Sequence, residues 1–130
     1  MKLPDVQNSV SDQTKDLIEL AIEIWRMEQR LNKAMSSIPE NQKELFDNSI
    51  QKFKKYLNKN DIEIIDHTNQ TFNEGRNVDI ISVENDNTIS ESVIKQTMEP
   101  TIIYKNQVVH KGKVIVLEKN NESLTEEKNE

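Results

Sequence analysis

Residues 100–118 read PTIIYKNQVVHKGKVIVLE. Two runs rich in β-branched and aromatic residues, 101–104 and 107–109, flank the polar pair Lys105-Asn106, a pattern typical of two strands joined by a tight turn. The basic step from His110 to Lys113 then leads into another apolar run at 114–117. The stretch therefore predicts a β-hairpin that continues into a further strand.

Shorter strand patterns precede this hairpin. Residues 62–65, 78–83 and 93–98 are apolar segments separated by polar turn residues. In 78–83 the apolar residues occur on both parities, which predicts a bulge or a strand that is covered on two sides. We therefore expect residues 59–118 to form a small, mostly antiparallel β domain.

The amino-terminal part has helical periodicity instead. From Asp12 to about Ile38, apolar residues recur alternately three and four positions apart and form a heptad seam. Ser36, Ser37 and Pro39 predict a helix break with a serine cap and a restart. The first seam consists of Leu17, Leu20, Ile24, Met27, Leu31, Ala34 and Ile38, and the second helix carries Phe46, Ile50, Phe53 and Leu57.

Residues 12–58 thus predict an antiparallel helical hairpin, but its first helix carries more apolar surface than one neighbour covers. Ile18, Ile22 and Trp25 widen the apolar arc to roughly 240°, against the ~100° stripe of a surface helix. Burying each such side chain stabilises a fold by about 1.5–3 kcal/mol. We therefore expect two hairpins to form a dimeric four-helix bundle or coiled coil, with these three residues at the dimer interface. The alternative is that they pack beneath the chain's own β segment.

Composition limits the classes of function. A chain of 130 residues with 34% hydrophobic residues has room for one compact domain, or for a helical arm that carries a small β module. No apolar run approaches the ~18 residues of a membrane span, and no targeting pattern is evident, so we expect a cytoplasmic protein without membrane contact. The net charge of −6 argues against nucleic acid as the main partner.

The two ends differ from the rest of the sequence. Residues 1–11 have no periodicity, and residues 119–130 are polar and acidic with a single leucine. Such segments have too little apolar surface to offset the entropy of ordering. We expect a disordered amino terminus and a disordered acidic tail.

Chemistry-bearing residues are sparse. The absence of cysteine excludes disulfides and thiolate metal ligands, and two glycines are too few for a phosphate-binding loop. His67 and His110 have no second ligand at metal-binding spacing, so we expect both to be solvated. Asp61, Asp66 and Asp79 stand at strand ends, where aspartate normally forms turns rather than an acid/base set. We therefore expect no enzyme activity, no cofactor and no metal.

Four segments resemble, in their order and spacing, parts of one protein family. Residues 20–34, LAIEIWRMEQRLNKA, are similar to a helix of that family that runs into a leucine and a small residue near its end. A helix followed by a Gly-Val-x-x-Ile step is similar to FKKYL at 53–57 with DIEII at 61–65. A Phe-Asp/Asn-Pro motif is matched by QTFN at 70–73, and an Asn-Gly/Asp-Arg-Val-Leu-Arg-Pro-Ala-x-Val-x-Val ending by NQVVHKGKVIV at 106–116. The chain thereby resembles the GrpE-type nucleotide exchange factors of DnaK-type heat-shock chaperones over about residues 12–118.

The chain departs from the family pattern at several positions. Glu74 replaces the usual proline, and residues 110–112 replace the Arg-Pro-Ala step. Gln107 stands where the family commonly has a basic residue that touches the chaperone. The amino-terminal helix is also short. These departures indicate a divergent member with a shortened coiled coil.

The resemblance implies a binding function without bond chemistry. The β module would dock on the ATPase domain of a DnaK-type chaperone, favour its open nucleotide cleft and so expel ADP, with the factor acting as a homodimer. The alternative is a dimeric adaptor or scaffold on the same fold, because fold alone does not fix function. For chaperone contact we select residues at turns or strand edges of the β module. These are Arg76, Lys105, Gln107, His110 and Lys111.

Overall fold

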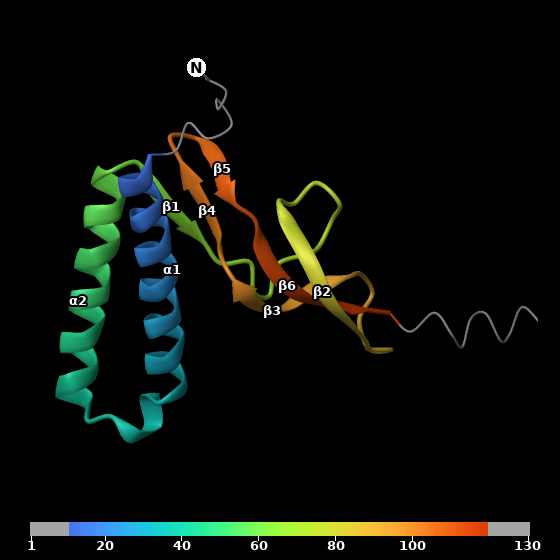
Figure 1. Cartoon of the computed structure of the whole chain (residues 1–130). Coiled ribbons are helices and arrows are strands. Elements are labelled where there is room, and N and C mark those ends of the chain that lie inside the picture. Colours follow the sequence, from blue (N-terminus) through green and yellow to red (C-terminus); the bar gives the residue numbers. More distant parts are fainter. Residues whose placement is uncertain (1–10, 120–130) are drawn as a thin grey trace, which may run out of the picture. The chain divides into compact units, whose positions relative to one another are not determined.

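The structure is a computed structural model, and it describes residues 11–119. Two long α-helices come first and six strands follow within this range (Figure 1). This architecture confirms the predicted α+β class. Both segments predicted to be disordered lie outside the described residues, apart from Ser11 and Lys119. The elements are α1 (Asp12–Lys33), the 3-10 turn η2 (Met35–Ser37), α2 (Glu40–Lys59), β1 (Ile62–Ile65), β2 (Val78–Asn85), β3 (Val93–Glu99), β4 (Thr101–Tyr104), β5 (Gln107–His110) and β6 (Gly112–Glu118).

Contacts divide the chain into two compact units. Unit 1 contains α1 and α2 together with β1 and the β4–β5 hairpin, and unit 2 contains β2, β3 and β6. The chain passes between the units after residues 64, 101 and 110. The domain boundary that we predicted at residue 59 follows the change of secondary structure, whereas the contacts group one β-hairpin with the helices.

The two helices are delimited differently from the sequence prediction. Ser11 caps α1, because its Oγ accepts a hydrogen bond of 3.1 Å from the Thr14 N–H. This helix ends at Lys33, earlier than the predicted end near Ile38, because the chain tightens into η2. The predicted serine cap of α2 is wrong, since Pro39 occupies that position and no side chain caps the helix. The helices run side by side (Figure 1).

The core of unit 1 joins α1 to the strands. Ile18 and Ile22 belong to the same buried cluster as Ile62 of β1 and Ile102 of β4. Trp25 is also buried, with 5% of its surface exposed. The premise that a single chain would leave these three α1 side chains exposed is therefore wrong. The chain's own β segment covers Ile18 and Ile22, so their assignment to a dimer interface loses its physical basis.

Part of each heptad seam stays outside this core. Ile24, Ile50 and Leu57 are buried, whereas four other seam residues are between 38% and 49% exposed. The exposed pair on each helix is spaced by one heptad, which places its two members on the same side of that helix. We call these four residues the outer helical face. They are Leu20 and Met27 on α1, and Phe46 and Phe53 on α2.

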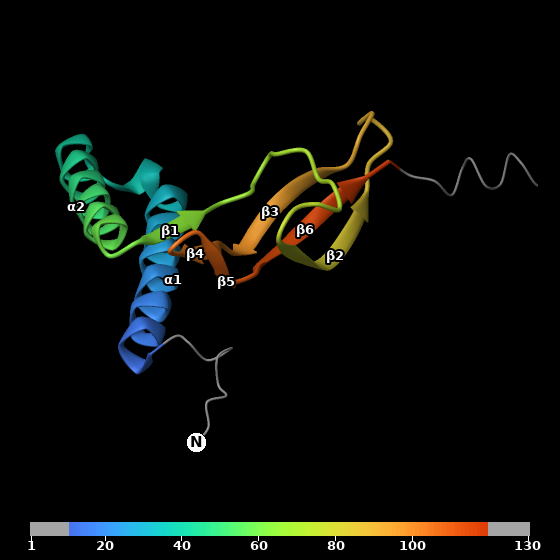
Figure 2. The ribbon, with the colours of Figure 1, turned by 90° about the horizontal axis from the view of Figure 1, so that it is seen from above.

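The strands form two sheets rather than one. Unit 1 holds the order β1-β4-β5, and unit 2 holds the order β2-β6-β3, with β6 in the middle (Figure 2). β4 and β5 are antiparallel, as are β3 and β6, but β2 is parallel to β6. The predicted bulge in β2 is present between Ile80 and Ser82. The core of unit 2 consists of Val78, Ile94, Val114 and Val116, with Phe72 packed against it.

Asp61 offers a test of the junction between α2 and β1. Its φ of 66° lies in the left-handed region, where an L side chain costs roughly 1–2 kcal/mol and glycine does not. Glycine avoids this cost, but part of the resulting stabilisation is lost because glycine makes the unfolded chain more flexible. We predict that Asp61→Gly raises the free energy of unfolding by about 0.5–1 kcal/mol, and that Asp61→Val lowers it. Urea denaturation measures both, and a less stable glycine variant would contradict the assignment.

Candidate functional site

The β4–β5 hairpin turns at Lys105-Asn106. Both residues have positive φ, 51° and 67°, which is the pattern of a type I′ turn, whose twist suits a two-residue hairpin. The turn is also hydrogen-bonded to the junction between α2 and β1, because the Lys105 N–H donates a hydrogen bond of 3.0 Å to the Asp61 carbonyl. The predicted tight polar turn is thus present.

The tip of this hairpin presents polar groups to solvent. Lys105 and Gln107 are both exposed. The Lys105 Nζ lies 5.3 Å from the centroid of the Tyr104 ring, within the range of a cation–π contact. This contact restrains a cationic group whose tip stays accessible.

An apolar pair lies behind the tip on the outward side of the hairpin. Tyr104 and Val109 pack against the core of unit 1, so the residues that alternate with them face away from it. Ile103 pairs with Val108 across the hairpin, and Val108 is 37% exposed. The sequence prediction missed Val108, because two adjacent valines do not reveal which one faces the core.

His110 is half-buried at the end of β5, where it pairs with Ile102. The structure therefore brings three of the five predicted contact residues onto one hairpin. These are Lys105, Gln107 and His110.

The other two predicted contact residues belong to unit 2 and have partners there. Arg76 is half-buried and its Nε donates a hydrogen bond of 2.7 Å to the Thr71 carbonyl. The Lys111 Nζ lies 3.0 Å from the Asp79 Oδ1, in an ion pair whose side chains are both about half exposed. Neither residue lies on the β4–β5 hairpin.

His67 is buried in unit 2, so the expectation that it is solvated is wrong. Only 4% of its surface is exposed, and its Nε2 lies 2.7 Å from the Thr101 Oγ1. Burial lowers the pKa of His67 below its ordinary value, the positive charge of Arg76 lowers it further, and Asp66 opposes this shift. No local pattern indicates this burial, because the partner Thr101 is 34 positions away along the chain.

The aspartates have structural roles. The Asp66 Oδ1 accepts a hydrogen bond of 2.8 Å from the Thr68 N–H, which is the turn chemistry expected of it. Asp79 pairs with Lys111. Among residues 11–119, no group of three His, Asp or Glu side chains is arranged to hold a metal ion.

Together, the helical hairpin, the two small sheets and the exposed β-hairpin define an α+β protein whose accessible features are suited to contact with another protein. The model of the GrpE family matches residues 5–118, and the chain therefore belongs to the GrpE family. This family consists of co-chaperones that act as nucleotide exchange factors for DnaK-type chaperones. A search of curated proteins found no match. Over the part of the chain that the structure describes, neither helix is long and apolar enough to cross a membrane.

Gly112 follows the β4–β5 hairpin at a point of close backbone approach. A Cβ atom there would lie 2.8 Å from the Thr101 Oγ1 and 3.0 Å from the Glu99 carbonyl oxygen. We predict that Gly112→Ala lowers the free energy of unfolding by about 1–3 kcal/mol, because a backbone atom cannot move aside as a side chain does.

The matched control is Gly75→Ala. The nearest atom there is the Oδ1 of the exposed Asn73 side chain, at 3.2 Å, which can move aside. We expect Gly75→Ala to change stability by no more than about 0.5 kcal/mol in either direction. Urea denaturation of both variants checks the pair, and equal effects would refute the close approach at Gly112.

Proposed function

We propose that this chain binds the ATPase domain of a DnaK-type chaperone and promotes release of ADP. The observation that carries the proposal is the extent of the GrpE match, which covers both helices and all six described strands. Because the match covers this whole architecture, it supports the function more strongly than one short motif would.

The proposed contact surface is centred on the tip of the β4–β5 hairpin. Lys105 supplies a charge and Gln107 a neutral amide at the tip of the hairpin. Val108, which follows Gln107 on the opposite face of β5, supplies an apolar contact on the outward side. Such a patch combines apolar burial with polar groups that fix orientation. His110 lies further along β5. Arg76 and Lys111 belong to unit 2 and are proposed as separate contacts with the chaperone.

Exchange by this route is a shift of a conformational equilibrium. A factor that binds the open nucleotide cleft better than the closed one increases the open population, from which ADP leaves. The coupling is reciprocal, so ADP must weaken binding of the factor by the same ratio. Moving a population from 1:99 to 99:1 needs about a 10⁴-fold difference in affinity, or ~5.5 kcal/mol. This free energy comes from contacts alone, so the proposal needs no catalytic side chain.

A hairpin used in this way has to hold its shape. The β4–β5 hairpin is anchored through Ile102 in the core of unit 1 and through the Lys105 hydrogen bond to Asp61. A flexible tip would bind the open and closed clefts almost equally, because it could follow either surface. The anchoring of the hairpin therefore favours selective binding of one state.

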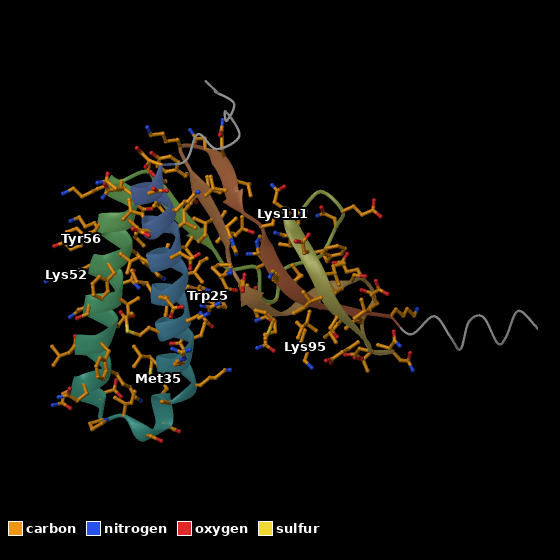
Figure 3. All side chains as sticks on the ribbon, viewed as in Figure 1. Trp25, Met35, Lys52, Tyr56, Lys95 and Lys111 are labelled. Atoms are coloured by element: carbon orange, nitrogen blue, oxygen red, sulfur yellow. The ribbon has the colours of Figure 1, made fainter. Side chains whose placement is uncertain are left out.

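We also propose that the chain acts as a homodimer through the outer helical face. Fully burying an exposed apolar side chain is worth about 1.5–3 kcal/mol, so each of these four, which are 38–49% exposed, would gain up to about half of that. Covering this face with that of a second hairpin gives a four-helix bundle with a symmetric contact. Tyr56, on the side of α2 away from α1, is 58% exposed and adds apolar surface to this helix (Figure 3).

The function is tested by release of a fluorescent ADP analogue from a DnaK-type ATPase domain. We predict that the protein accelerates release by about tenfold or more, within the range of typical coupling energies. Stopped-flow fluorescence with and without the protein measures the rate. An unchanged rate, with a folded dimer present throughout, would instead favour the adaptor or scaffold function.

A charge reversal on the hairpin tests the contact surface. We predict that Lys105→Glu with His110→Glu slows exchange by about tenfold, while the melting temperature stays nearly unchanged, because surface substitutions usually alter stability by no more than about 0.5 kcal/mol. The control is Asn41→Glu with Gln42→Glu and Asn48→Glu, which adds comparable negative charge at exposed positions of α2. If this control slowed exchange equally, the hairpin assignment would be refuted.

A second pair of substitutions tests the dimer. We predict that Met27→Asp with Phe53→Asp converts a dimer into a monomer of 15.2 kDa, because each new carboxylate would have to lose its hydration at the interface. Asn48→Asp, at an exposed position of α2, is the control that should remain dimeric. Sedimentation velocity distinguishes the species. A wild-type protein that sediments as a monomer at micromolar concentration would exclude the proposed dimer.

A further inference from the structure

A cluster of buried polar groups in unit 2 lies where the chain leaves this unit and returns to it. Thr101 is the first residue of β4 and the last residue of unit 2 before the chain enters unit 1, and Gly112 begins β6 shortly after β5 ends. The Gly112 N–H donates a hydrogen bond of 3.1 Å to the Thr101 Oγ1. This bond therefore closes the two ends of the hairpin segment on each other. His67 completes the cluster through its contact with the same oxygen.

The hydrogen bonds of Thr101 determine the tautomer of His67. The Thr101 hydroxyl has one proton, and it donates that proton to the Asn77 carbonyl oxygen at 3.0 Å. Its oxygen must then accept from both other neighbours, the Gly112 N–H and the His67 Nε2 at 2.7 Å. The neutral imidazole consequently carries its proton on Nε2, which leaves Nδ1 as the atom that takes up a proton in acid.

The His67 Nδ1 is poorly placed to become charged. It is buried and has no hydrogen-bond partner in the described part of the chain. Arg76 is the positive group that acts on the ring, and Asp66 is the negative one. The cluster residues on β3, β4 and β6 are uncharged, namely Thr97, Thr101 and Gly112.

The charged neighbours of these residues along the chain have ion-pair partners elsewhere. Glu99 pairs with Lys113 at 3.8 Å, and Lys111 pairs with Asp79. A protonated imidazole would therefore be a buried cation whose Nδ1–H meets no acceptor, which is unfavourable.

We propose that the His67–Thr101–Gly112 cluster is an acid-sensitive device, in which neutral His67 holds the two ends of the β4–β5 segment together and protonated His67 releases them. A protonated ring moves toward water, and the Thr101 Oγ1 then loses one of the two N–H donors from which it accepts. The Gly112 N–H bond to Thr101 is left without the support of His67 on the same oxygen, so the closed base of the hairpin segment loosens.

The direction of the pH dependence follows from the burial of the ring. The pKa of folded His67 lies below its ordinary value of 6.5, so the folded chain binds this proton less readily than the unfolded chain does. The cluster is intact above about pH 6.5, and its contribution to stability is lost as the pH falls through the lowered pKa. The further expectation that exchange weakens in acid rests on the proposed function, because the segment carries Lys105 and Gln107.

The first test reads His67 directly in the wild-type protein and needs no chaperone. The chain has two histidines, so His110→Gln assigns the remaining imidazole signals to His67. Nitrogen-15 NMR at pH 7.5 should show the proton on Nε2, and the titration midpoint of His67 should lie below 6.5. A proton on Nδ1, or a midpoint at or above 6.5, would overturn the proposal.

The second test follows the Gly112 amide by hydrogen exchange at pH 7.5 and pH 5.0, corrected for the intrinsic pH dependence of exchange. We expect its protection to fall at least tenfold at pH 5.0 in the wild type. In His67→Gln it should be equal at both pH values, because the glutamine amide still donates to Thr101 but does not titrate. Equal protection at both pH values in the wild type would refute the device, as would an equal loss in both proteins. If His67→Gln does not fold, the wild-type measurements decide. Both tests use the isolated chain, so their outcome does not depend on whether the protein accelerates ADP release from the chaperone.

Discussion

The packing of α1 against β1 and the β4–β5 hairpin is the contact on which the rest of the structure depends. It joins Ile18 and Ile22 near the start of the chain to Ile102 near its end, across a separation that makes the loop-closure entropy appreciable. The strands of unit 1 cover one apolar side of α1, and α2 covers another side of it. A single chain therefore buries much of the surface of α1, which is apolar over most of its circumference. The outer helical face stays partly exposed, and it is there that we propose a second copy packs.

The same contact supports the binding function that we propose for the β4–β5 hairpin. The hairpin that carries Lys105 and Gln107 is held by the helical core at its base and by Asp61 at its turn. A rigid projection can distinguish two shapes of a partner's cleft, and that difference in affinity is all that nucleotide exchange requires. The chain matches the GrpE family model over residues 5–118, and its β5 begins at the neutral Gln107.

Sequence patterns predicted the elements well and their partners poorly. The heptad seams and β-branched runs located both helices and all six described strands, because periodicity reports which residues a local element must bury. Periodicity does not report what covers them, so Ile22 was assigned to a second copy although Ile102 lies against its cluster. His67 was missed for a related reason, since its burial depends on Thr101, which no local pattern connects to it. The turn was placed correctly at Lys105-Asn106, with Gln107 opening the next strand, because turn chemistry is local.

Native-state hydrogen exchange at increasing denaturant tests most directly whether the hairpin and the helices form one cooperative unit. The amides of α1 and those of β4 and β5 should open with the same free energy, and Ile22→Ala should lower that value for all three elements together. If the β4 and β5 amides instead opened together with β2, β3 and β6, and were insensitive to Ile22→Ala, the hairpin would belong to the other unit and the structural basis proposed here for its rigidity would be wrong.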